Sequence, residues 1–130
     1  MKQSMKFILL FYCFFLCSCS FQRLYAVPTL TAESKAWSYY YYGIELEQNT
    51  QWKEALESFI TAAKYDPYGL RIHLHIAICA LELQEYSLVK KHLARIESLL
   101  LEQGKQDTMF YKDLNALYIK WHQQQMHEIK

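Results

Sequence analysis

The residue types that could bind a metal are scattered through this sequence, with no recognisable grouping. His73 and His75 are two residues apart, and His122 and His127 are five apart. Neither spacing is the i, i+4 arrangement that places two histidine ligands on one face of a helix. We therefore expect no metal site.

Motifs for acid–base, phosphate and nucleophile chemistry are also missing. Glu54 and Glu57 would share one helix face, but Gln51 and Lys53 beside them indicate a solvated surface. The sequence has no G-x-x-x-x-G-K-[ST] loop, no G-x-S-x-G elbow and no C-x-x-C pair, and its three glycines are too few for phosphate-binding loops. We predict that the chain is not an enzyme and uses no cofactor.

Three of the four cysteines lie within or directly after an apolar run near the start of the chain. Lys2 and Lys6 precede residues 7–17, FILLFYCFFLC, which are all apolar or aromatic. This layout predicts a secretory signal peptide. Even extended to residue 21, the run would form a helix of about 22 Å, whereas the hydrocarbon core of a bilayer is roughly 30 Å thick. An uncleaved membrane-spanning anchor would therefore require local thinning of the bilayer.

The sequence Leu16-Cys17-Ser18-Cys19 resembles the lipobox of bacterial lipoproteins. The resemblance implies that the Cys19 thiol is acylated and that the peptide bond before it is cut. Acyl chains would form a stable membrane anchor, because each buried CH₂ contributes about 0.8 kcal/mol. Ser20 is similar to the residue that follows the cysteine in lipoproteins sent to the outer membrane. The alternative is an ordinary signal peptide cut later, for instance after Ala26.

The remainder of the chain favours helices joined by short loops. Three glycines and two prolines among 130 residues are too few for the turns of a β-sandwich or a doubly wound α/β fold. The 14 basic and 13 acidic residues are interspersed, so we expect no nucleic-acid partner. Helices are expected near 32–48, 51–65, 68–83, 85–101 and 107–125.

The first four of these helices are related by an internal repeat, in which position i matches position i+34. At this offset, small residues align with small ones and large apolar residues with large apolar ones. The aligned pairs are Gly43 with Ala77, Leu46 with Ala80, Trp52 with Tyr86, Ala55 with Val89, Phe59 with Leu93 and Ala62 with Ile96. The offset is the length of a tetratricopeptide repeat, which is one helix–turn–helix unit.

The first unit resembles the tetratricopeptide family closely. Residues 39–46 stand where the family has W-x₂-L-G-x₂-Y, and Ala55, Phe59, Ala62 and Pro67 match the second half of its motif. The resemblance implies an all-α, short tetratricopeptide-like helical solenoid. Its parts would be a signal peptide over 1–18, a lipid-anchored tether over 19–31, repeats over 32–67 and 68–101, and a capping helix over 107–125.

The same resemblance implies that the chain recognises another protein. In this family the first helices of successive repeats line a concave groove that holds a peptide or partner segment. By the repeat register, the groove would be lined by Trp37, Tyr40, Ile44, Glu47, Gln48, Arg71, Leu74, Ile78, Leu81 and Glu82. The alternative is that the fifth helix or the tether folds back over this apolar strip.

Two further expectations concern buried residues. On the first helix, Tyr39 and Tyr42 should face the core, with Tyr40 toward the groove and Tyr41 on the outer side. Cys79 is expected to be a small buried hydrophobe, and an intermolecular disulfide is the alternative.

The leading hypothesis is a non-catalytic lipoprotein on the outer membrane, facing the periplasm, whose helical surface docks another envelope protein. The sequence does not select the partner or the envelope machine. The competing hypothesis is a structural homo-oligomer, such as a homodimer, in which a second copy of the chain covers the apolar groove.

Overall fold

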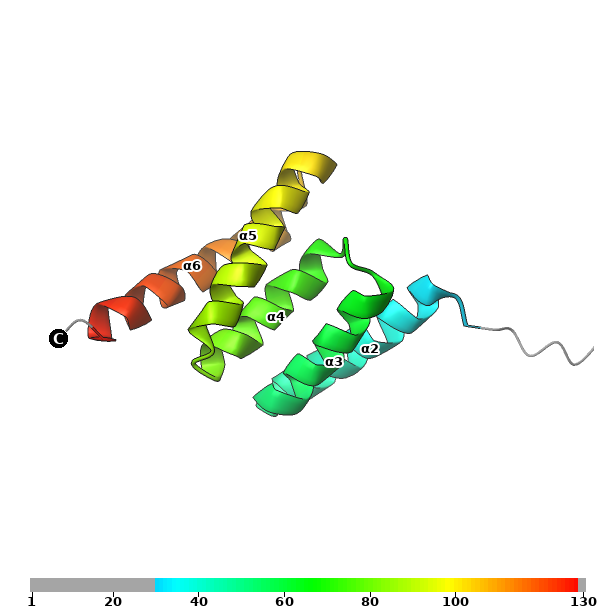
Figure 1. Ribbon diagram of the computed structural model, residues 1–130, viewed down its shortest axis with the longest axis horizontal. Helices are drawn as coiled ribbons and strands as arrows, with labels where there is room; N and C mark the ends of the chain where they lie inside the picture. Colours follow the sequence, from blue (N-terminus) through cyan, green and yellow to red (C-terminus); the bar gives the residue numbers. More distant parts are fainter. Residues whose placement is uncertain (1–29, 129–130) are drawn as a thin grey trace, which may run out of the picture.

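The chain folds into helices throughout the part that the structure describes, residues 30–128. In this computed structural model (Figure 1) the helices are α2 (Ala32–Gln48), α3 (Trp52–Tyr65), α4 (Leu70–Glu82), α5 (Tyr86–Gln103) and α6 (Thr108–Glu128). No β-strand occurs between residues 30 and 128. Every helix begins and ends within three residues of its expected range, and the prediction of an all-α fold is confirmed.

The first four helices form two hairpins, α2–α3 and α4–α5, that close with the same turn. Thr50 and Gln84 have φ angles of 58° and 61°, in the left-handed region, and they are aligned by the repeat register. In the first turn, Gln51 donates its backbone N–H to the Leu46 carbonyl at 2.9 Å. In the second turn, Glu85 donates to the Ala80 carbonyl at 2.8 Å, again five positions earlier. The period found in the sequence therefore corresponds to a repeated backbone conformation.

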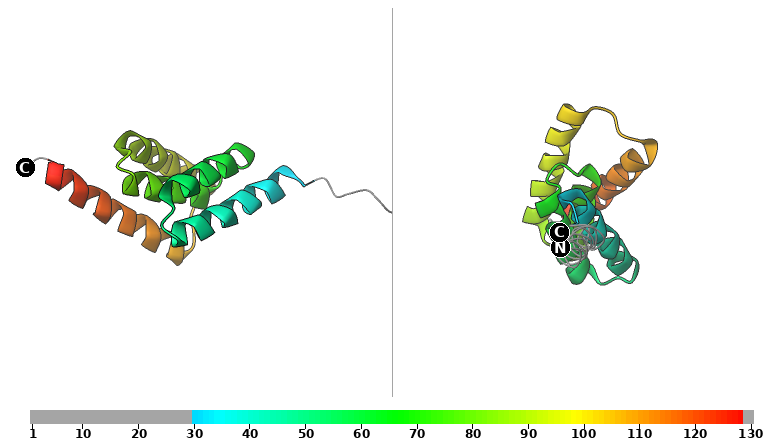
Figure 2. Two further views of the ribbon diagram at one scale, coloured as in Figure 1. Left: turned by 90° about the horizontal axis from the view of Figure 1, so that it is seen from below. Right: turned by 90° about the vertical axis from the view of Figure 1, so that its right-hand side faces the viewer.

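The helices form two sides of an elongated molecule. Helices α2 and α6 lie on one side, whereas α3 and α5 lie on the other (Figure 2, left). Helix α4 contacts α3, α5 and α6, so it joins the two hairpins to the C-terminal helix. The start of α2 and the end of α6 lie at opposite ends of the long axis (Figure 1).

The first hairpin closes around Gly43 of α2 and Phe59 of α3. Phe59 is fully buried, and a Cβ atom placed on Gly43 would lie 2.7 Å from its ring. Only glycine permits this approach of the two helices without displacing the ring. Tyr40 packs against the same ring, with 5.9 Å between the ring centroids.

A second core cluster joins α4 and α5 to α6. Leu74 and Leu81 of α4 are almost fully buried, and they belong to the same cluster as Phe110, Leu114 and Trp121 of α6. Helix α6 therefore covers part of α4 with its apolar stripe, which is the role expected of a terminal helix that shields the last apolar face.

The connections between these helices contain Pro67 and Gly104, two residues that interrupt helices. Pro67 lies in the turn between α3 and α4, where Asp66 Oδ1 accepts a hydrogen bond from the Tyr68 N–H at 3.1 Å. Gly104 ends α5 with a φ of 77°, a left-handed conformation that glycine adopts readily.

The expected burial of two tyrosines is wrong. Tyr39 is 40% exposed and Tyr42 is 56% exposed, although both were expected to face the core. Since Gly43 and Phe59 bring α2 and α3 close together, little space remains between the helices for further large rings. Tyr39 lies at the edge of the interface instead, where its ring stacks on that of Tyr65 at 5.9 Å.

Candidate functional site

Two hollows border α2 and α4, and we treat them as the candidate site. The first, called here the aromatic hollow, has a volume of about 240 Å³. Its lining comes from α2, α4, the end of α5 and the two loops beside them, and consists of Ala36, Trp37, Tyr40, Asp66, Tyr68, Gly69, Leu70, Arg71, Ile72, Gln103 and Gln106.

Trp37 is the most prominent apolar group of the aromatic hollow. It is 46% exposed, stacks on Tyr41 at 5.8 Å and meets the edge of Tyr40 at 5.6 Å. Burial raises the pKa of the Tyr40 phenol, which is therefore neutral near pH 7. An exposed indole held between two tyrosines offers a rigid apolar surface at low cost in side-chain entropy.

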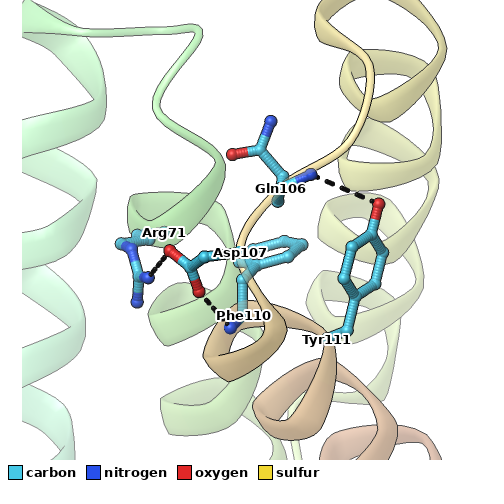
Figure 3. Close-up of polar contacts among 5 residues, drawn as sticks. All are labelled: Arg71, Gln106, Asp107, Phe110 and Tyr111. Atoms are coloured by element: carbon cyan, nitrogen blue, oxygen red, sulfur yellow. Dashed lines mark hydrogen bonds and ion pairs between the residues drawn. The ribbon is translucent and has the colours of Figure 1, made fainter.

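A polar cluster at the start of α6 fixes that helix beside the aromatic hollow (Figure 3). Asp107 forms an ion pair with Arg71 of α4, and its Oδ1 accepts a hydrogen bond from the Phe110 N–H at 2.8 Å. The hydrogen bond from Phe110 and the nearby Arg71 guanidinium lower the pKa of the Asp107 carboxyl. The ion pair is solvent-exposed and adds little stability, but it sets where α6 begins relative to α4.

The second hollow, called here the acidic hollow, has a volume of about 360 Å³. It is lined by α2, α4 and α6 together, through Glu47, His75, Ile78, Leu81, Glu82, Asp113, Ala116, Leu117 and Lys120. His75 Nδ1 lies 2.7 Å from Glu47 Oε2, and Lys120 forms an ion pair with Glu82. The floor is therefore apolar, and the rim carries three carboxylates and one ammonium group.

Most of the groove residues expected from the repeat register lie at these two hollows. Trp37, Tyr40 and Arg71 line the aromatic hollow. Glu47, Ile78, Leu81 and Glu82 line the acidic hollow. Ile44 is half-buried and Gln48 is exposed, and neither lines a hollow.

One expected groove residue is corrected by the structure. Leu74 is only 1% exposed because it lies in the core cluster shared with α6. It therefore offers no surface to a partner. Tyr40 and Leu81 are buried as well, so they form the walls and floor of the hollows and do not project from them.

Sequence reasoning missed a buried pair of histidines between α4 and α5. His73 Nδ1 and His92 Nδ1 are 3.0 Å apart, and His73 Nε2 lies 3.0 Å from the Pro67 carbonyl oxygen. This carbonyl can only accept, so His73 Nε2–H donates to it, and His92 Nδ1–H donates to His73 Nδ1. Both imidazoles are then neutral.

Burial lowers the pKa of His73, and burial together with His73 and Lys91 lowers the pKa of His92 to about 4. The repeat register gives no sequence signal for this pair, although its position has a structural counterpart. In the preceding repeat the two aligned positions are Tyr39 and Ser58, where the Ser58 hydroxyl donates to the Tyr39 carbonyl at 2.7 Å. Each hairpin thus carries one polar contact between its helices at the same register.

Among the remaining reactive groups of the described residues, no cluster of metal ligands is found. Residues 30–128 contain no group of three or more histidine, cysteine, aspartate or glutamate side chains placed to hold a metal ion. Cys79 is a free, fully buried thiol whose pKa is raised to about 12 by burial. Its burial is as expected, and it is not positioned to form a disulfide with a second chain.

Two further results bear on the context of the site. The predicted signal peptide, Cys19 and the predicted tether up to residue 29 lie outside the described residues. None of the helices from α2 to α6 is long and apolar enough to cross a membrane. A scan against protein-family models and searches of curated proteins and of solved structures gave no match to this chain.

Proposed function

We propose that this chain is a small tetratricopeptide-type adaptor without catalytic activity, which docks a segment of another protein in the groove formed by α2, α4 and α6. The repeated turn at Thr50 and Gln84 supports the repeat assignment, as does the equal burial of aligned positions. Ala55 and Val89, for example, are both fully buried. Helix α6 is the cap that completes this short solenoid.

The observation that carries this proposal is the pair of hollows along one face of α4. The aromatic hollow and the acidic hollow both border α2 and α4, and each combines apolar side chains with a few polar groups. Such mixed hollows suit the alternating apolar and polar side chains of a peptide segment or a helix. Because they lie on one face, a single extended segment could occupy both.

We further propose that the chain is a lipoprotein, attached through Cys19 to the outer membrane and facing the periplasm. This part rests on the apolar run over 7–17 and on the lipobox resemblance at residues 16–19. A partner is therefore expected among other envelope proteins. The tether over 19–31 would separate the groove from the membrane surface.

Site-specific photocrosslinking in native membranes tests the docking groove. A photoreactive amino acid is placed at Trp37 in the aromatic hollow and, as a matched control, at Glu57, which is exposed on α3 and lines neither hollow. We expect a discrete adduct from position 37 only. In a second experiment, Trp37→Ala combined with Arg71→Glu should abolish recovery of the partner without changing the helical circular dichroism spectrum. Equal adducts from both positions, or partner recovery unaffected by the double substitution, would show that the groove is not the site. An adduct with the mass of a dimer would favour the homo-oligomer instead.

Membrane attachment has a separate test. Cys19→Ala should release the protein from membranes or leave the signal peptide uncut, as followed by detergent partitioning and by the mass of the chain. Unchanged processing and partitioning would argue against the lipid anchor while leaving the docking proposal intact.

A further inference from the structure

The acidic hollow combines an apolar floor with an excess of negative charge. Ile78 and Leu81 of α4 and Leu117 of α6 provide the floor. Glu47, Glu82 and Asp113 provide carboxylates from three different helices, and Lys120 is the one lysine or arginine in the lining. A segment that fills this hollow must therefore bury aliphatic groups next to negative charge.

Two of the three carboxylates already contact a side chain that can carry positive charge. Lys120 pairs with Glu82, and His75 lies against Glu47 at 2.7 Å. The ammonium group of Lys120 thus occupies a favourable position for a cation inside the hollow. Because the Lys120 side chain is 46% exposed, a partner can replace it at little energetic cost.

Asp113 is the carboxylate that remains available. Within residues 30–128 it accepts no hydrogen bond and forms no ion pair, and its longer-range interactions are with Arg71 and Tyr40. A cation brought by a partner could therefore pair with Asp113 without breaking an existing contact.

We propose that the acidic hollow binds a basic, aliphatic segment of the partner protein, in which lysine or arginine side chains flank leucine-like side chains. This inference rests on the proposed docking function and adds the chemical class of the partner. The aliphatic side chains would cover Ile78 and Leu117, and the cations would pair with Asp113 and Glu82. Charge complementarity of this kind chiefly sets specificity and the association rate. An acidic segment is disfavoured, because its carboxylates would face those of the rim.

The test compares two fluorescein-labelled amphipathic peptides that share the same leucines and differ only in carrying lysine or glutamate on the polar face. Binding to the full chain in neutral detergent is measured by fluorescence anisotropy. We expect the lysine peptide to bind at least about tenfold more tightly, and its affinity to fall when the salt concentration rises about tenfold.

Three variants tie the preference to the hollow. Asp113→Asn combined with Glu82→Gln should weaken the lysine peptide about five- to tenfold, since each exposed pair contributes a factor of a few. Lys120→Gln should strengthen its binding about two- to fivefold, because the internal competitor for Glu82 is removed. Glu54→Gln, an exposed carboxylate outside the hollow, is the matched control and should change nothing.

The outcomes separate this inference from the docking proposal. Equal binding of the two peptides, binding of neither, or insensitivity to the Asp113 and Glu82 substitutions would overturn the basic-segment inference, even if crosslinking from Trp37 succeeds. Preference for the glutamate peptide would also overturn it and would indicate an acidic partner. Self-association that the same two substitutions abolish would overturn it in favour of a second copy of the chain.

Discussion

Replacing Gly43 by alanine should destabilise the protein, although the same change in an ordinary helix would stabilise it. Alanine in place of a helical glycine gains about 1 kcal/mol. Here the added Cβ would lie 2.7 to 2.9 Å from three carbon atoms of the Phe59 ring. That ring is fully buried and also packs against Tyr40 and His75, so it has no free direction in which to move. Overpacking of this kind costs about 1–3 kcal/mol.

Because three ring atoms are involved, we take the upper part of that range and expect a net loss of about 2 kcal/mol in the free energy of unfolding. Urea unfolding followed by circular dichroism measures it. In a Phe59→Leu background the added Cβ finds room, so Gly43→Ala should be neutral or stabilising there, with a coupling energy of about 2 kcal/mol. Ala77→Gly at the aligned position is the matched control and should cost about 2 kcal/mol, because it loses helix propensity and a fully buried methyl group. A stabilised Gly43→Ala single variant would refute the contact argument.

Three further predictions concern protonation, the free thiol and the turns. His92 is neutral in the folded state, and its pKa is lowered from 6.5 to about 4. The unfolded chain therefore binds a proton at a higher pH than the folded chain does, and the free energy of unfolding should decrease as the pH falls from about 6.5 toward 4. Urea unfolding should show a loss of about 2 kcal/mol between pH 7 and pH 5. This decrease should shrink in His92→Gln, which keeps a hydrogen-bond donor and does not titrate. Because Cys79 is fully buried, the native chain and Cys79→Ala should show equal numbers of thiols reactive toward Ellman's reagent, and they should differ by one only after denaturation; a difference under native conditions would contradict the burial. A β-branched residue such as Thr50 is strained at a φ of 58°. Thr50→Gly should therefore raise the free energy of unfolding by about 0.5–1 kcal/mol, which is more than the gain expected from Gln84→Gly. A larger gain from Gln84→Gly would count against strain at Thr50.

The sequence predicted the helices and the hairpin pairing because both depend on buried positions. In each hairpin a small residue on the first helix packs near a large residue on the second. These pairs are Gly43 with Phe59 and Ala77 with Leu93. Alignment of the two repeats reveals such positions directly, because burial restricts their size. The turns follow the same register, even though neither Thr50 nor Gln84 is a residue type typical of a left-handed conformation.

A fifth helix covering the groove strip was one of the sequence-based alternatives, but neither the contact of α6 with Leu74 nor the histidine pair could be predicted from the repeat register. Helix α6 does not continue the period, so nothing in the repeat register indicates that it covers Leu74. The contact of His73 with His92 depends on the exact crossing of α4 and α5, and its counterpart at Tyr39 and Ser58 uses a backbone carbonyl. A polar contact that changes both chemistry and partner type between repeats leaves no size pattern in the sequence.

The same reasoning explains why the period cannot identify the partner. In the repeat register, Trp37 of the aromatic hollow aligns with Arg71, and the exposed Gln48 aligns with Glu82 of the acidic hollow, so groove positions change in charge and polarity from one unit to the next. Buried positions keep their size because a change there costs stability, whereas a groove position experiences no such restraint from the fold. What the groove binds is therefore determined by residues that the fold leaves free to vary, and a measurement of charge preference at the acidic hollow tests it more directly than the repeat assignment does.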